Sequence, residues 1–225
     1  MITPRLECIL KSIQADCIAD VGTDHAYIPI RAVSEGICRR AIACDIRKGP
    51  CDTARRHIRR YGLEDRIQVR LGRGLCPVSA KEADQFIIAG MGGELIRAIL
   101  EESVEKAKMR PLILQPMNCQ QELRHYLIEN GFVIEREDLA AEGFKVYNLM
   151  LVRAGKMKPF EKEIDYHIPP YLEGHPHFSM LYQKKKREFT RIYEGMQRSA
   201  SPDPAVLEKY GKLLNQLKER YKERE

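Results

Sequence analysis

Short apolar runs alternate with stretches of helical periodicity over the first 130 residues of the chain. The apolar runs predict strands at residues 17–21, 40–45, 67–71, 85–88 and 112–115. The intervening stretches carry apolar side chains three and four positions apart, which predicts helices at residues 4–14, 26–37, 49–61, 93–107 and 119–130. Strands separated by helices of this length indicate βαβ crossovers and therefore a parallel sheet.

The pattern changes after residue 130. Residues 132–139 and 146–153 are two β-rich runs joined by a glycine-containing turn with no helix between them, which predicts a hairpin. A mostly parallel sheet whose last strand is antiparallel resembles the architecture of class I methyltransferases. We therefore predict an α/β, Rossmann-like fold of this kind for the first part of the chain.

The last third of the chain has a different composition. Proline, glycine and histidine interrupt residues 158–176, and two helical patterns follow, separated by the sequence Ser-Ala-Ser-Pro-Asp-Pro. Apolar side chains share one face of each pattern, which predicts an antiparallel helical hairpin. We predict two domains, an α/β domain at residues 1–155 and a helical, coiled-coil-like domain at residues 156–225.

Composition narrows the class of protein. The chain has 225 residues and is 44% hydrophobic, which is ample for a buried core. No run approaches the roughly 18 apolar residues of a membrane span, and the N-terminus lacks the h-region of a signal peptide, so we expect a cytoplasmic protein with no membrane partner. The seven cysteines are scattered without a C-x-x-C pair, so we expect reduced thiols and no metal site.

Acidic side chains end the first two predicted strands. Asp20 ends the first, which then turns through Gly22, and Asp45 ends the second. The carboxyl ends of parallel strands meet at one edge of a sheet, where nucleoside cofactors bind. The first loop lacks the glycines that cradle a pyrophosphate, whereas a carboxylate suits the charged methionine part of S-adenosylmethionine. We therefore predict S-adenosylmethionine as the cofactor, with Asp45 accepting hydrogen bonds from its ribose; the alternative for Asp45 is a helix N-cap.

Glycine-rich loops follow the third and fourth strands. Arg73 stands where many methyltransferases carry an acid or an amide for the adenine amino group, so we assign that contact to the backbone of residues 72–75. The fourth strand runs into Ala-Gly-Met-Gly-Gly-Glu at residues 89–94, where glycines would let a flat base approach, or would serve a tight strand–helix connection. The D/N-P-P-Y motif of amino-group methyltransferases is absent. This favours a ring nitrogen with an in-plane lone pair, such as N1 of adenine, as the methyl acceptor.

The loops together supply a set of candidate site residues. The predicted cofactor contacts are Asp20, Gly22, Thr23, Asp24, His25, Asp45, Ile46, Gly72, Arg73, Gly74, Ala89 and Gly90. The residues predicted to lie at the substrate base are Asp24, Gly90, Met91 and Gly92, with Asp24 stabilising the charge that develops on the base. His25 and Tyr27 either line this pocket or pack in the fold, and Asn118 either orients a base or caps a helix.

Basic side chains gather in two places, which is more informative than the net charge of +6. One group follows the second strand and the other lies in the first C-terminal helix: Arg55, Arg56, Arg59 and Arg60; Lys184, Lys185, Lys186 and Arg187. Such groups either contact the phosphates of a nucleic acid or form a solvated helix face.

Six sequence segments resemble one family, the bacterial tRNA (adenine(22)-N1)-methyltransferases. They are ADVGTDHAYIPI at 19–30, ACDI at 43–46, GRGL at 72–75, AGMGGELI at 89–96, LQPM at 114–117 and a hairpin ending in GFKVYNLML. They span most of residues 1–153, and a helical C-terminal extension is also typical of the family. The departure is Arg73, which replaces the neutral or acidic side chain expected at the adenine.

The resemblance implies a monomeric enzyme that transfers a methyl group from S-adenosylmethionine to N1 of adenine 22 in tRNA. The base would turn out of its stack, and no covalent nucleophile or strong base would be required. Three alternatives stay open: methylation of another RNA base or of a small molecule, an RNA-binding protein that keeps a cofactor fold without catalysis, and an NAD-type dehydrogenase.

Overall fold

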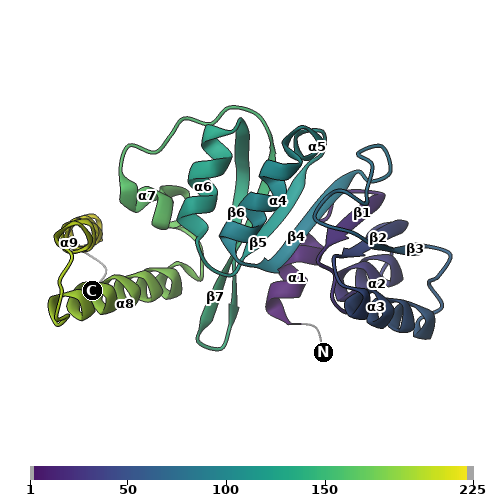
Figure 1. Cartoon of the computed structure of the whole chain (residues 1–225), viewed down its shortest axis with the longest axis horizontal. Helices are drawn as coiled ribbons and strands as arrows, with labels where there is room; N and C mark the ends of the chain where they lie inside the picture. The colour runs from purple at the N-terminus through teal and green to yellow at the C-terminus, as the bar shows by residue number, and fades with distance from the viewer. Residues whose placement is uncertain (1–2, 222–225) are drawn as a thin grey trace. The chain divides into compact units, whose positions relative to one another are not determined.

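The computed structural model describes residues 3–221, which form two compact units (Figure 1). The first unit contains the chain up to Glu142 together with Tyr147–Pro159, and the second contains Gly143–Val146 and the chain from Phe160. The first two and last four residues of the predicted domains lie outside the described residues. The exact division at residue 155 stays a prediction.

Seven strands form one sheet in the described part of the chain, in the order β3-β2-β1-β4-β5-β7-β6. Their bounds are β1 Cys17–Val21, β2 Arg40–Asp45, β3 Ile67–Leu71, β4 Gln85–Met91, β5 Leu112–Pro116, β6 Phe132–Glu142 and β7 Lys145–Ala154. β1 pairs in parallel with both β2 and β4, and β7 is antiparallel to β5. This arrangement confirms the predicted Rossmann-like sheet with an antiparallel last strand. The strand order reverses between β1 and β4, so their carboxyl ends border a crevice.

Helices cover both faces of this sheet (Figure 1). The helices of the first unit are α1 Pro4–Lys11, α2 Tyr27–Ser34, α3 Lys48–Arg60, α4 Gly93–Glu102, α5 Val104–Lys108 and α6 Gln120–Glu129. Side chains alternate along each strand, so Ile18 and Ile87 pack with α1–α3, whereas Ala19 and Ile88 pack with α4–α6. The parallel strands are therefore apolar on both faces, as is usual when helices cover both sides.

Several predicted helices are shorter than the apolar pattern suggested; the helix predicted at 26–37, for example, spans Tyr27–Ser34. Two further cases show why. The helix predicted at 93–107 divides at Ser103, whose φ of −135° and ψ of 36° lie outside the helical region. The helix predicted at 4–14 ends at Lys11, although Ile13 is still buried. In both cases apolar burial continues past the helix end, so hydrophobic spacing alone overestimated the helix length.

A buried ion pair connects the β6–β7 hairpin to α6. Arg124 of α6 pairs with Glu137 of β6, and both side chains are fully buried. Asn148 of β7 donates its Nδ2–H to Glu137 Oε1 over 2.7 Å. Breaking a buried pair by removing one partner leaves an uncompensated charge, so this contact is a strong constraint on the position of the hairpin.

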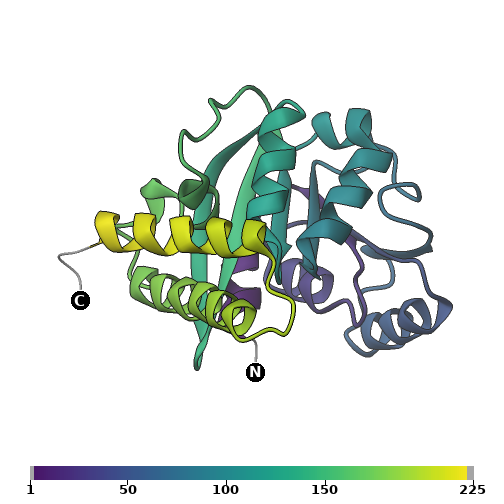
Figure 2. The same cartoon turned by 60° about the vertical axis from the view of Figure 1, so that its left-hand side comes forward.

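The second unit is helical. It contains α7 Glu163–His167, a 3₁₀ turn at Pro170–Leu172, α8 Phe178–Gln197 and α9 Pro204–Arg220. α8 and α9 lie side by side and antiparallel (Figure 2), which confirms the predicted helical hairpin. Asp203 caps α9 by accepting from Ala205 N–H over 2.8 Å, and Arg220 pairs with both Asp165 and Glu173. Within residues 3–221 no helix combines the length and apolarity needed to cross a membrane.

Candidate active site

A cavity of about 580 Å³ lies at the carboxyl ends of β1, β2, β3 and β4. Four loops and one face of α4 line it: Gly22 and Asp24; Asp45, Ile46 and Arg47; Gly72, Arg73 and Gly74; Ala89, Gly90 and Met91; and Leu95, Ala98 and Ile99. Ten of the predicted site residues are therefore brought together, from segments up to about 70 positions apart. The crevice beside the reversal in strand order is where open α/β sheets bind their ligands.

The first loop is tied to β2 and comes very close to the β4 loop. The N–H groups of Gly22 and Thr23 both donate to the carbonyl of Cys44, over 2.8 and 2.9 Å. Gly22 has a φ of +79°, and a Cβ atom there would lie 1.9 Å from the Met91 Cε atom. Only glycine meets both requirements easily, since it adopts positive φ freely and leaves this part of the cavity open.

Asp45 presents its carboxylate at the end of β2. Its side chain is buried, and Oδ1 accepts from the Arg47 N–H over 2.8 Å. No residue that the structure describes hydrogen-bonds Oδ2. The acceptor capacity of this oxygen is thus available to a hydroxyl group in the cavity.

Asp20 lies behind the cavity wall and is absent from its lining. Burial, together with the negative charge of Asp45, raises the pKa of Asp20 to about 6. Two acids whose side chains are both buried at this strand edge create a negative field, which favours a cationic ligand.

The structure turns His25 away from the predicted cofactor site. Asp24 and Ala26 both have positive φ, 45° and 57°, and the turn between them aims the His25 ring at Tyr27 and His57. The ring centroids lie 5.2 Å from Tyr27 and 5.4 Å from His57, and both contacts are stacked. His25 therefore does not line the cavity, and Thr23 is buried beneath the loop.

Arg73 is held at the rim by an ion pair. Its Nε atom lies 3.0 Å from Glu102 Oε2 at the end of α4. The neighbouring Gly72 N–H donates to the Asp45 carbonyl over 2.9 Å, and a Cβ at Gly72 would lie 3.0 Å from the Pro77 ring. The backbone of this loop is thus fixed against β2, while the Arg73 charge is already compensated.

The glycines after β4 serve two different purposes. Cβ atoms at Gly92 and Gly93 would lie 2.9 Å from Asn118 Oδ1 and 2.3 Å from the Cys119 carbonyl, so these two glycines permit close backbone packing. Gly90 instead has a φ of +75° and lines the cavity beside Met91. Asn118 accepts from the Gly93 N–H over 3.3 Å and so caps α4.

One wall of the cavity was not predicted from the sequence. Leu95, Ala98 and Ile99 recur at helical spacing on α4 and face the cavity. Ile46 and Leu95 are large apolar side chains that remain 61% and 53% exposed, so a flat apolar ring between them would remove this surface from water. Their spacing was visible in the sequence, but it was indistinguishable from ordinary helix packing.

In each of the two predicted basic groups, some side chains are exposed and others are buried or paired with a carboxylate. On α3, Arg55 pairs with Asp52 and Arg59 with Glu64, whereas Arg56 and Arg60 are exposed and have no carboxylate within ion-pair distance among residues 3–221. On α8, Lys185 is only 3% exposed and donates to Glu188. Lys184 donates to the Val146 carbonyl over 3.2 Å, and burial lowers its pKa. Lys186 is partly buried and lies over the Tyr182 ring, whereas Arg187 is exposed.

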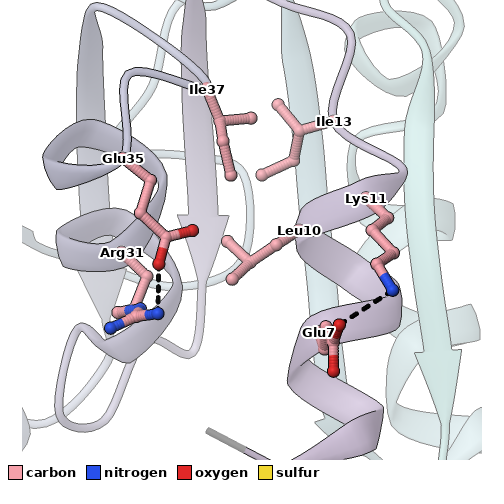
Figure 3. Close-up of a pocket in the computed structure, with 7 residues that line it drawn as sticks. All are labelled: Glu7, Leu10, Lys11, Ile13, Arg31, Glu35 and Ile37. Carbon is pink, nitrogen blue, oxygen red and sulfur yellow. Dashed lines mark ion pairs between the residues drawn. The ribbon is translucent and has the colours of Figure 1, made fainter.

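A second cavity of about 490 Å³ lies between α1 and α2 (Figure 3). Leu10, Ile13 and Ile37 provide its apolar floor. Its charged rim consists of two closed ion pairs, Glu7 with Lys11 and Arg31 with Glu35. None of the predicted site residues lines this cavity.

Comparisons with known proteins show the family of the chain. A methyltransferase domain family matches residues 2–150. A tRNA (adenine(22)-N(1))-methyltransferase of Bacillus subtilis is 36% identical over 156 residues, which are 68% of this chain and about two thirds, 66%, of that relative. The crystal structure of the B. subtilis m1A22 tRNA methyltransferase TrmK has a TM-score of 0.85 at 30% identity and covers 97% of this chain and 98% of that one.

The chain belongs to the bacterial tRNA (adenine(22)-N1)-methyltransferase family. A further structure in the same comparison is that of a Streptococcus pneumoniae protein regarded as a candidate tRNA (m1A22) methyltransferase, in complex with S-adenosyl-L-methionine. It has a TM-score of 0.85 at 34% identity and covers 97% of this chain and 99% of that one. The resemblance seen in the sequence motifs is thus confirmed, and it extends over the C-terminal unit as well as the sheet.

Proposed function

We propose that this protein methylates N1 of adenine 22 in tRNA, with S-adenosylmethionine as the methyl donor. The observation that carries the proposal is the cavity at the reversal in strand order, which the buried carboxylate of Asp45 and a glycine loop line, with the buried Asp20 behind its wall, in a chain of this family. The donor supplies a methyl group on a positively charged sulfur. Everything else in the reaction is binding and orientation by the protein.

The cavity residues fit this donor chemically. Asp45 Oδ2 is available to accept from the ribose, Ile46 and Leu95 would enclose the adenine, and the backbone of residues 72–74 borders its edge. The carboxylates of Asp20 and Asp24 give the methionine end a negative environment. The volume of about 580 Å³ is in the range of small-molecule sites.

The acceptor side of the reaction requires position rather than proton transfer. N1 of adenine has an in-plane lone pair, and its methylated product is a cation, so no base has to remove a proton in this step. Gly90 and Met91 border the cavity where the base would arrive, and Asp24 is the carboxylate we assign to the developing positive charge. The enzyme holds N1 in line with the methyl group at near-attack distance.

The remaining assignments form part of the same proposal. Residues 1–155 act as the donor-binding domain and residues 156–225 as a helical domain that assists tRNA binding. Exposed cations on α3 and α8, chiefly Arg56, Arg60 and Arg187, contact tRNA phosphates. We place the enzyme in the cytoplasm, where tRNA is modified, and expect it to act as a monomer.

The decisive experiment incubates the protein with unmodified tRNA and tritiated S-adenosylmethionine and maps the labelled nucleotide. We expect label at adenine 22 as 1-methyladenosine, and none in a matched tRNA that carries guanine at position 22. Label at another base, or in a small molecule only, would replace the proposed substrate. Donor binding without incorporation into any RNA would support a non-catalytic RNA-binding role instead.

A further inference from the structure

Arg5 of α1 lies close to Gly90 near the end of β4, although the two residues are 85 positions apart. Its Nη1 atom donates to Gln115 Oε1 over 2.9 Å, and the same oxygen accepts from the Gly90 N–H over 3.1 Å. A Cβ atom at Gly90 would lie 3.3 Å from this Nη1 atom. One side-chain oxygen thus connects the N-terminal helix to the glycine loop of the site.

The side chains of Arg5 and Gln115 are both held in place by further contacts. Arg5 lies over the ring of Tyr147, with 5.5 Å between the guanidinium carbon and the ring centroid, and its backbone N–H donates to Glu142 Oε1 over 3.0 Å. Gln115 is 1% exposed, and its Nε2 donates to the Pro116 carbonyl over 3.1 Å. If the amide were flipped, its NH₂ group would face two other donors, so the observed orientation is the one that the contacts select.

This contact determines which way the Ala89–Gly90 peptide faces. In a trans peptide the C=O group points opposite to the N–H group of the next residue, and the described residues contain no cis peptide. The Gly90 N–H points to Gln115 on β5, so the Ala89 carbonyl points to the other side, toward β1. The cavity lies on that side, and both Ala89 and Gly90 line it.

We propose that Arg5 and Gln115 are positioning residues that aim the Ala89 carbonyl at the 6-amino group of the target adenine. This inference rests on the proposed function and adds to it the basis of the choice of adenine. A carbonyl accepts from the 6-amino group of adenine and repels the 6-oxo group of guanine.

The same contact would strengthen during the reaction. The N1–methyl bond forms as the carbon–sulfur bond breaks, the sulfur keeps the electron pair as a neutral thioether, and the base becomes cationic. No proton moves in this step. The positive charge spreads onto the 6-amino group, so a carbonyl fixed in advance stabilises the transition state more than the bound substrate.

The test compares two substrates in two enzymes. One tRNA carries adenine at position 22 and the other carries purine, which lacks the 6-amino group; single-turnover methyl transfer is measured at saturating donor and tRNA. For Arg5→Met we expect a loss of about 10-fold or more with adenine and less than about 3-fold with purine, because the lost contact is absent from the purine reaction in both enzymes. Comparing fold-changes cancels the lower intrinsic reactivity of purine.

Further variants and a binding measurement make the result decisive. Arg31→Met breaks only the rim pair with Glu35 and should leave both rates unchanged. Arg5→Lys keeps a donor and should recover part of the adenine rate, and Gln115→Leu repeats the experiment if Arg5→Met does not fold. S-adenosylmethionine affinity, measured by calorimetry, should change less than about 2-fold in the Arg5 variants. An equal loss for both substrates would overturn this inference alone, whereas wild-type protein that leaves adenine 22 unlabelled would overturn the proposed function and this inference with it.

Discussion

Arg73 Nε lies 3.0 Å from Glu102 Oε2, so the cation that follows β3 is paired with the carboxylate at the end of α4. The pair is largely exposed, with 66% of the Arg73 side chain accessible. This relationship resolves the one departure from the family pattern. In the proposed donor complex, the charge of Arg73 is compensated outside the cavity, and the backbone of residues 72–74 borders the adenine ring.

The first prediction concerns this pair. We expect Arg73→Ala to change S-adenosylmethionine affinity by less than about 3-fold, because exposed ion pairs contribute at most about 1 kcal/mol and the backbone contacts remain. Asp45→Ala, measured alongside by calorimetry, should weaken binding by about 10-fold or more, because it removes a charged acceptor from the ribose. Equal losses in the two variants would mean that the Arg73 side chain itself contacts the donor.

The second prediction concerns Asp20 and pH. Burial raises its pKa from 3.8 to about 6, so the folded protein favours the protonated acid. The free energy of unfolding is therefore not reduced by Asp20 below pH 4, where the acid is protonated in both the folded and the unfolded protein. The reduction appears as the pH rises through about 6 and remains at pH 7. Asp20→Asn should therefore stabilise the ligand-free protein by about 3 kcal/mol at pH 7 and by almost nothing at pH 4.

Denaturant unfolding of both proteins at several pH values measures this difference. The same substitution should weaken S-adenosylmethionine binding at pH 7, because it removes a negative charge from the donor's environment. A stability gain that is the same at pH 4 and pH 7 would show that titration of Asp20 is not its cause. A gain in stability with unchanged affinity would leave the pKa assignment intact and remove Asp20 from donor binding.

The third prediction concerns the buried pair under the hairpin. We expect Arg124→Met to destabilise the first unit by about 3–5 kcal/mol, because it leaves the Glu137 carboxylate buried without its partner. Arg153→Met is the matched control: it breaks an exposed pair with Glu135 on the same hairpin and should cost about 1 kcal/mol or less. The double variant Arg124→Met with Glu137→Leu should recover most of the loss in urea unfolding. If it does not, packing rather than the uncompensated charge explains the effect.

Much of this fold follows from the sequence, because its physical causes are local. β1, β2 and β3 begin and end as predicted, since β1 and β2 are short, largely apolar runs and β3 alternates apolar with polar side chains. The division at Ser103 could not be predicted in the same way, because burial of Ala107 continues the apolar spacing past it. Helix length depends here on tertiary packing, which overrides the local pattern.

The sequence was sufficient to predict which loops form the candidate site, but not the direction or burial of every side chain in them. Strand topology alone brings Gly22, Asp45 and Gly90 together, so the spacing of loops in the sequence was sufficient for them. The direction of His25 depends on positive φ angles at Asp24 and Ala26, which non-glycine residues adopt only when their surroundings require it. Lys185 belongs to a basic run but lies on the apolar stripe of α8, so its burial follows from helix geometry that a charge count ignores.

The last prediction concerns the arginines of α3 and tRNA. Arg55 and Arg59 are paired with Asp52 and Glu64, whereas Arg56 and Arg60 are not paired with any described carboxylate. A cation without a carboxylate partner is free to neutralise an RNA phosphate and release its counterion, whereas a paired cation must first leave its carboxylate. Replacing Arg56 and Arg60 by alanine should therefore lower the slope of log Kd against log salt by about 1–2, and replacing Arg55 and Arg59 should lower it less. Filter binding with unmodified tRNA at four salt concentrations measures both slopes.

Equal reductions of the slope in the two double variants would show that the ion pairs of Arg55 and Arg59 open when tRNA binds. Unchanged slopes in both variants would place the tRNA-binding surface away from α3.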